Sequence, residues 1–147
     1  MNVVPLADNN FADLVTLFGS NGANSGCWCM WWRVPAKDWA SNGNAGNRAA
    51  LTATVARGEP VGLLAYHDGA PVGWVAVAPR PAYPRLLRST TLRPQAADEP
   101  GVWSVTCFYI HRHHRRSGVA ADGDLVRQRR IPRAFPARHR PPDRDEG

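Results

Sequence analysis

The chain has 147 residues, of which 44% are hydrophobic and 20% charged, a composition typical of one folded domain. No apolar run approaches the roughly 20 residues that cross a bilayer, and the N-terminus lacks the basic and apolar regions of a secretory signal, so we expect neither. The formal net charge of +6 indicates nucleic-acid binding only weakly, because 17 of the 18 basic residues are arginine, as GC-rich coding sequence also produces.

The first predicted element is a short helix near the N-terminus. Apolar residues recur at helical spacing from Phe11 to Phe18, after a short lead-in from Pro5. Asn9 or Asn10 is suited to the N-cap, and Gly19 is suited to end the helix. Its apolar face requires a sheet to pack against.

The next segment, GCWCMWWR at residues 26–33, has no polar face and is therefore either buried or part of a ligand groove. Cys27 and Cys29 are separated by one residue, which is poor spacing for a tetrahedral zinc site, so we expect no metal. The three tryptophans favour core packing over an aromatic wall for a substrate. The odd number of cysteines disfavours a disulfide framework and predicts a cytoplasmic protein.

A second helix is predicted over Asn44–Arg57, where alanines and spaced apolar residues precede Gly58. A β-hairpin follows, with strands at 61–66 and 71–77 joined by His67-Asp68-Gly69-Ala70. Asp-Gly supplies the positive φ angles that a tight hairpin turn requires, so this is the clearest local signal in the chain.

Residues 79–101 hold five prolines and predict a long surface connection. The run from Val102 to Ile110 is almost continuously apolar, which predicts a central strand with both faces covered. The strand leads directly into the basic turn, which we define as residues 111–118, HRHHRRSG.

The basic turn has the chemistry of a phosphate site. Free backbone N–H groups at a helix N-terminus converge on one point, and the helix dipole favours an anion there. Gly118 removes the Cβ that would block the approach, while Arg115, with less weight on Arg112 and Arg116, supplies positive charge. These residues therefore predict binding of a diphosphate.

The order of helices, hairpin, strand and basic turn resembles the GNAT acetyltransferase superfamily. Residues 115–120, RRSGVA, are similar to its acyl-CoA signature, and GCWCMWWR resembles a segment of one bacterial branch. The resemblance covers roughly residues 5–120 and implies an α+β (mixed α/β) fold with a central, mostly antiparallel sheet flanked by helices. It also implies acetyl transfer from acetyl-CoA to an amine acceptor whose identity, like the oligomeric state, stays open.

The resemblance further assigns contacts with acetyl-CoA. The amides from Arg116 to Ala121 are expected to cradle the pyrophosphate, and the pantetheine arm is expected to pair with the end of the strand. The expected binding residues are Phe108, Tyr109, Ile110, Arg112, Arg115, Arg116, Ser117, Gly118, Val119, Ala120 and Ala121.

The catalytic residues are left unassigned, because WSVTCFYI contains no carboxylate where the family often places its base. Glu59 and Tyr109 are weak candidates, although a solvated turn and core packing are the favoured roles. The three imidazoles at His111, His113 and His114 have suitable intrinsic pKa values, but a role beside phosphates is favoured. For Cys107, a packed thiol is favoured over a nucleophile.

Beyond residue 120 the chain departs from the family pattern. Residues 1–120 are interpreted as a partial acetyltransferase domain, and residues 121–147 as a short helix continuation, to about Arg130, followed by an Arg/Pro-rich tail that we expect to be disordered. The sudden change in composition suggests a shifted reading frame. Two alternatives therefore accompany the enzyme: an inactive CoA-binding remnant and, with less support, a nucleic-acid-binding module.

Overall fold

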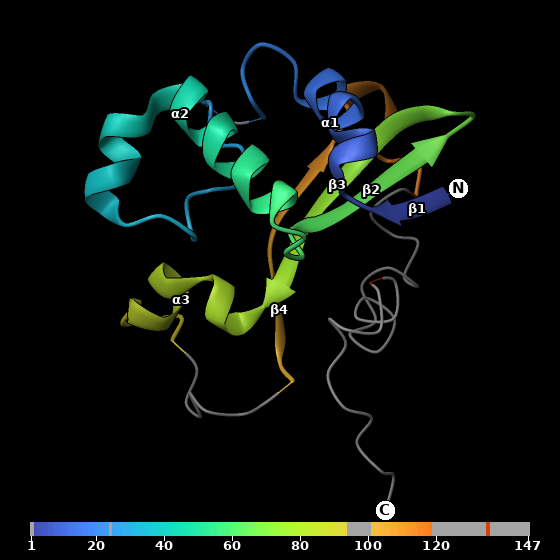
Figure 1. The fold of residues 1–147 in the computed structure, drawn as a ribbon. Helices are drawn as coiled ribbons and strands as arrows, with labels where there is room; N and C mark the ends of the chain where they lie inside the picture. The colour runs from blue at the N-terminus through green and yellow to red at the C-terminus, as the bar shows by residue number, and fades with distance from the viewer. Residues whose placement is uncertain (1, 24, 94–100, 119–134, 136–147) are drawn as a thin grey trace, which may run out of the picture.

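The computed structural model describes residues 2–23, 25–93, 101–118 and 135. It contains a four-stranded antiparallel sheet whose strands follow chain order (Figure 1). The strands are β1 (Asn2–Pro5), β2 (Gly62–His67), β3 (Ala70–Pro79) and β4 (Trp103–Ile110). β1 was not predicted, because four residues are too few to show the alternation of a strand.

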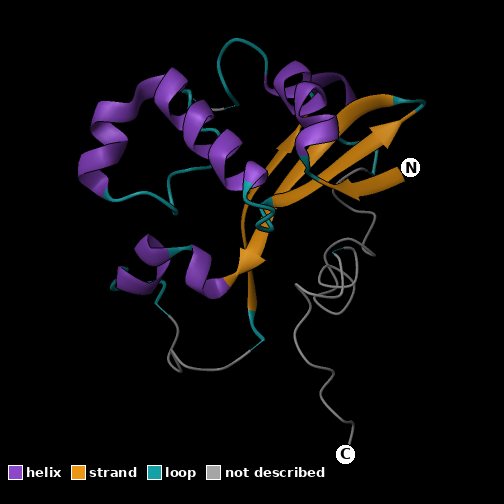
Figure 2. Ribbon diagram, in the orientation of Figure 1, coloured by secondary structure: helices purple, strands orange, loops and turns teal. Residues whose placement is uncertain are grey.

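The helices surround one end and one face of this sheet (Figure 2). They are α1 (Phe11–Phe18), α2 (Ala36–Ala56) and α3 (Pro84–Arg88), with 3-10 turns at Asp8–Asn10, Arg80–Ala82 and Arg112–His114. None of the helices in the described ranges is long and apolar enough to span a membrane.

The helix predictions near the N-terminus are confirmed. α1 has Asn10 as N-cap and Gly19 as C-cap, as the spacing of its apolar residues indicated. α2 begins eight residues earlier than predicted, but its backbone breaks at Gly43 (φ 60°), so the part after the break matches the predicted helix.

The hairpin of β2 and β3 is also confirmed. Its two turn residues, Asp68 and Gly69, have φ angles of 49° and 78°, the left-handed pair of a type I′ turn. The pairing register shifts between Ala65 and Tyr66, which face Gly73 and Pro71, so that Val72 is an extra residue on β3.

The main core lies between α1, α2 and one face of the sheet. Leu14 and Phe18 of α1 and Leu51 of α2 pack with Leu64 and Trp74, and all five side chains are almost fully buried. Residues 28–30 join this core, so the segment 26–33 is buried at its centre. Trp31, by contrast, is 42% exposed, so the segment is not buried throughout.

The opposite face of the sheet has its own smaller cluster. It contains Leu63, Val75, Val77 and Phe135, with Trp103 against them. The rings of Phe135 and Trp103 lie 5.0 Å apart. The predicted disorder of residues 121–147 and the helix continuation to Arg130 otherwise concern residues outside the described ranges.

β4 differs from the predicted central strand. Within the described residues it pairs with β3 alone, and Val105 and Phe108 are 38% and 47% exposed. Thr106 is an extra residue in the pairing, because Ala76 faces Cys107 whereas the next residue, Val77, faces Val105. This β-bulge reverses the alternation of side chains, so that Cys107 packs in the main core and Trp103 on the opposite face.

Candidate functional site

The basic turn is anchored at one end of the sheet. Ile110 pairs with Gly73, and the backbone N–H of His111 donates to the carbonyl of Val72 at 2.9 Å. A 3-10 turn then closes through the N–H of His114, which donates to the His111 carbonyl at 2.8 Å. The chain thus leaves β4 and turns back within four residues, beside the hairpin of β2 and β3.

The imidazoles form a cluster on this turn. The ring centroids of His111 lie 5.2 Å from His113 and 6.0 Å from His114, and His67 of the hairpin lies 6.0 Å from His114. Desolvation lowers the pKa of His111, and the charges of the neighbouring histidines and arginines lower it further. Both causes disfavour the protonated form of His111.

The end of the basic turn, residues 116–118, has a backbone that is suited to bind an anion. The amides of Arg116, Ser117 and Gly118 donate to no carbonyl of a residue that the structure describes. Arg116 and Gly118 have φ angles of 64° and 88°, and a Cβ built on Gly118 would meet nothing within 4 Å. Successive amides with such a backbone form a concave donor site for an anion.

Two side-chain contacts hold the turn in shape. The Nε of Arg115 donates to the carbonyl of Ile110 at 3.1 Å, which leaves both terminal nitrogens of its guanidinium for other partners. The hydroxyl of Ser117 donates to the carbonyl of His114. The turn is therefore folded back on the end of β4 rather than extended from it.

The predicted binding residues from Phe108 to Gly118 follow one another along the end of β4 and the basic turn, while Val119, Ala120 and Ala121 lie outside the described residues. Phe108 lies on the exposed face of β4. Tyr109 points to the other face, where its ring is 5.3 Å from that of Phe18. The structure therefore places Tyr109 against the core, although its backbone still belongs to the strand edge.

Glu59 lies in a different part of the molecule from the basic turn. It precedes Gly62, whose neighbours across the sheet are Ala76 and Cys107. Its carboxylate pairs with Arg57 at 2.9 Å, and the hydrogen bond from this guanidinium lowers the pKa of Glu59. Both side chains are about half exposed.

Sequence reasoning missed two buried hydroxyls beside the bulge. Tyr83, in the proline-rich connection, has no exposed surface, and Thr106 lies close enough to affect its pKa. Neither hydroxyl has a hydrogen-bond partner among the described residues. Arg33 covers the Tyr83 ring, with its guanidinium carbon 5.0 Å from the ring centroid. No signal in the sequence marks this contact, because it joins three distant segments.

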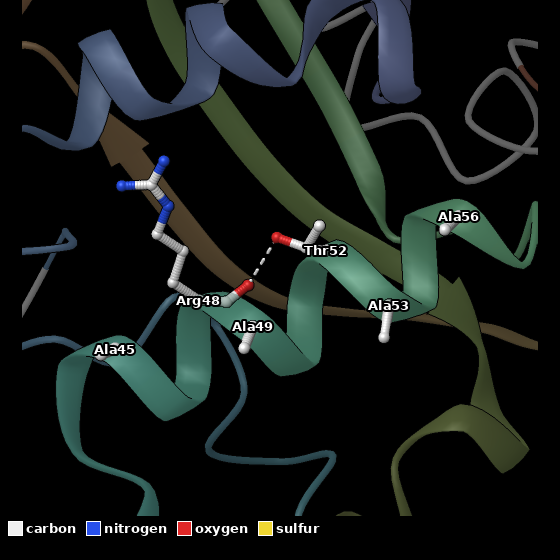
Figure 3. Close-up of a pocket in the computed structure, with 6 residues that line it drawn as sticks. All are labelled: Ala45, Arg48, Ala49, Thr52, Ala53 and Ala56. Atoms are coloured by element: carbon white, nitrogen blue, oxygen red, sulfur yellow. Dashed lines mark hydrogen bonds between the residues drawn. The ribbon is translucent and has the colours of Figure 1, made fainter.

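A shallow depression of about 520 Å³ lies elsewhere, on α2 (Figure 3). Its lining comes from this one helix: Ala45, Arg48, Ala49, Thr52, Ala53 and Ala56. It shares no residue with β4 or the basic turn, so the predicted site and this depression are separate features.

Comparison with known proteins gives the family. Residues 28–122 match the model of the acetyltransferase (GNAT) family, and no curated protein matches. The branch suggested by GCWCMWWR stays a prediction.

Two solved structures are similar to the chain. An aminoglycoside antibiotic 6'-N-acetyltransferase from Acinetobacter haemolyticus is 21% identical with a TM-score of 0.52, over 89% of this chain and 70% of that one. A structure from Corynebacterium glutamicum described as histone acetyltransferase HPA2 and related acetyltransferase is 20% identical with a TM-score of 0.44, over 86% and 70% of the two chains. The first shows the shared fold. Together with the family match, which spans β2, β3, β4 and the basic turn, it identifies the chain as a member of the GNAT acetyltransferase family.

Proposed function

We propose that this protein transfers an acetyl group from acetyl-CoA to an amine acceptor, with the diphosphate of CoA bound at the basic turn. The observation that carries the proposal is the space that the described residues leave open at Gly118. It is flanked by arginines and by amides that donate to no carbonyl within the described ranges, and it lies at the end of the outermost described strand.

The donors of the basic turn fit a diphosphate in number and type. The amides of Arg116, Ser117 and Gly118 supply directed N–H groups without a Cβ at the last position. Arg115, whose guanidinium is tethered to the strand end, adds a charge that is already oriented. Arg112 and Arg116 increase the local positive potential, and we retain Val119, Ala120 and Ala121 as expected contacts.

The pantetheine arm is proposed to lie along the outer edge of β4. An edge strand directs every second pair of N–H and C=O groups away from its neighbour, which allows an extended amide chain to pair with it. From the basic turn the arm would pass Ile110, Tyr109 and Phe108 and bring the thioester towards the bulge at Thr106.

The proposed position of acetyl-CoA determines which candidate residues could accept the proton of the amine. The three histidines of the basic turn lie at the diphosphate end, so we assign them to phosphate binding. Glu59 lies nearer to the proposed position of the thioester. It comes three residues before Gly62, which faces Ala76 on β3, and Ala76 in turn faces Cys107 on β4. Its lowered pKa keeps the carboxylate ionised but reduces its affinity for a proton. Glu59 therefore stays the candidate to test, and Tyr109 contributes through its backbone.

Calorimetric titration with acetyl-CoA, followed by turnover measurements with an amine panel, tests this function. Binding with release of free CoA thiol supports the enzyme. Binding without turnover on any amine would favour the inactive remnant. Salt-sensitive binding to arbitrary DNA with no response to acetyl-CoA would overturn both and favour the nucleic-acid module.

A further inference from the structure

The three cysteines of the chain are brought to one place in the fold. Cys27 and Cys29 come from the segment before α2, and Cys107 comes from β4, almost 80 residues later. Cys29 is a member of the main core, and Cys107 packs against the same core. None of the three is in a disulfide. The predicted function gives no role to this cluster.

The backbone that carries Cys29 is strained. Trp28 and Cys29 have φ angles of 46° and 55°, a left-handed conformation that costs about 1–2 kcal/mol for each residue other than glycine. The indole N–H of Trp74 donates to Cys29 Sγ at 3.2 Å. Cys27 Sγ accepts from the backbone N–H of Cys29 at 3.5 Å. Trp28 and Cys29 are the central pair of a tight turn, which the N–H of Met30 closes by donating to the carbonyl of Cys27 at 2.8 Å, and this turn keeps Cys27 and Cys29 close together.

The thiols of Cys29 and Cys107 differ in environment. Cys29 is 7% exposed, whereas Cys107 is only half-buried on the edge strand. A hydrogen bond from Cys29 lowers the pKa of Cys107, while the bonds to Cys107 and Cys27, together with burial, raise the pKa of Cys29. A reactive, partly accessible thiol beside a protected second thiol is the arrangement of a cysteine pair that responds to oxidants.

We propose that Cys107 and Cys29 form a modification site for hydrogen peroxide, at which Cys107 is the attacking thiol and Cys29 the resolving thiol. The Cys107 thiolate attacks one peroxide oxygen, the O–O bond breaks, and Cys107 becomes a sulfenic acid with release of water. Cys29 then attacks the Cys107 sulfur, a second water leaves, and an S–S bond forms. The pair loses two electrons and two protons, and the peroxide is reduced to two waters.

The bond would join the strained segment to β4 at the residue that follows the bulge. Cys107 is adjacent to Thr106 in sequence, and the pantetheine arm is proposed to reach this part of the strand. Oxidation should therefore weaken acetyl-CoA binding. This consequence rests on the proposed function, whereas the disulfide itself does not.

The test is peroxide treatment of the reduced full-length protein, followed by intact-mass measurement and peptide mapping. We expect the loss of two hydrogen atoms per chain and one cross-linked peptide that joins Cys29 to Cys107. Cys27→Ser is the matched control and should give the same product. Cys29→Ser should leave a sulfenic acid that dimedone captures at Cys107, and Cys107→Ser should form no bond to Cys29.

Thermal unfolding of each variant shows whether it is folded, and alkylation at neutral pH gives a second readout in the unoxidised protein. Iodoacetamide should label Cys107 first, and more slowly in Cys29→Ser. A Cys27–Cys29 bond, an acetylated Cys107 after incubation with acetyl-CoA alone, or a protein that keeps all three thiols under peroxide would overturn the proposal. Formation of the Cys29–Cys107 bond in a protein that does not bind acetyl-CoA would refute only the proposed function.

Discussion

The two middle strands and the last strand of the sheet are built from similar apolar sequences but have different surroundings. On β2 and β3, Leu63, Leu64 and Val77 are at most 1% exposed, because helices cover one face and the Phe135 cluster the other. On β4, Val105 and Phe108 remain exposed and the outer edge is unpaired among the described residues. Apolar content alone therefore did not determine burial.

The difference separates a structural region from the region that we propose binds acetyl-CoA. The middle strands have paired edges and interlocked side chains, so changes there should act on stability. Among the described residues, β4 and the basic turn combine an unpaired strand edge, amides without a carbonyl acceptor and several arginines, so changes there should act on binding. Each of the following substitutions tests whether stability or acetyl-CoA binding changes, as its position in the fold predicts.

The largest expected effect is on stability, from Phe135→Ala. Phe135 is 3% exposed and packs on Trp103, so removal of its ring should lower the free energy of unfolding by about 3 kcal/mol. Urea unfolding measures this loss. Leu92→Ala is the control, because Leu92 is 56% exposed and its loss should cost less than about 0.5 kcal/mol. Equal losses for the two variants would show that Phe135 does not complete the second cluster.

The next effect is on binding, from Gly118→Glu. A carboxylate would enter the open space that we assign to the diphosphate, and like charges in contact cost several kcal/mol. Calorimetry should show acetyl-CoA affinity reduced by at least about a hundredfold.

Gly69→Ala is the control for backbone strain in this experiment. Gly69 has a φ angle of 78° and open space around a built Cβ, as Gly118 does, but it lies in the hairpin turn. This variant should lose stability and keep its affinity. Retained affinity in Gly118→Glu would place the diphosphate elsewhere.

Arg115→Gln should have a smaller effect on binding. The change removes one charge-assisted contact and leaves the backbone amides in place, so affinity should fall about tenfold and depend less on salt. Arg48→Gln removes the same charge from α2 and should leave the affinity unchanged. Equal losses in both variants would indicate that overall charge, and not the basic turn, attracts the ligand.

Glu59→Gln should have the smallest effect on stability. Because Arg57 lowers the pKa of Glu59 in the folded state, the ion pair stabilises the fold above the ordinary Glu pKa of 4.5 and is lost as pH falls through the lowered value. The variant should be slightly less stable than the wild type at pH 7 and equal to it at strongly acidic pH. Thermal unfolding across this range measures the difference, and a constant difference at every pH would exclude the ion pair as its cause. Acetyl transfer by the same variant tests the proposed role of Glu59.

The features that could be predicted from the sequence are those that depend on residues close together in the chain. The helix ending at Gly19, the Asp68-Gly69 turn and the strand leading into the basic turn all depend on neighbouring residues, and all three are present. The basic turn was assigned to phosphate because of its glycine and arginines, and this assignment stays a prediction.

The features that the sequence did not predict depend on contacts between distant segments. The bulge at Thr106 results from pairing with β3. Regular alternation would place Trp103 and Cys107 on the same face of the sheet, but the bulge places them on opposite faces. Tyr83 is buried by residues from two other segments although it lies in a proline-rich connection. Cys29 and Cys107 likewise join the same core only once the sheet has formed.

Amide NMR of the ¹⁵N-labelled protein during titration with CoA is the most direct measurement of whether the basic turn receives the diphosphate. We predict saturable shifts of the Arg116, Ser117 and Gly118 N–H resonances, with little change for residues of α2. Saturation of CoA binding while these three resonances stay in place would contradict the assignment.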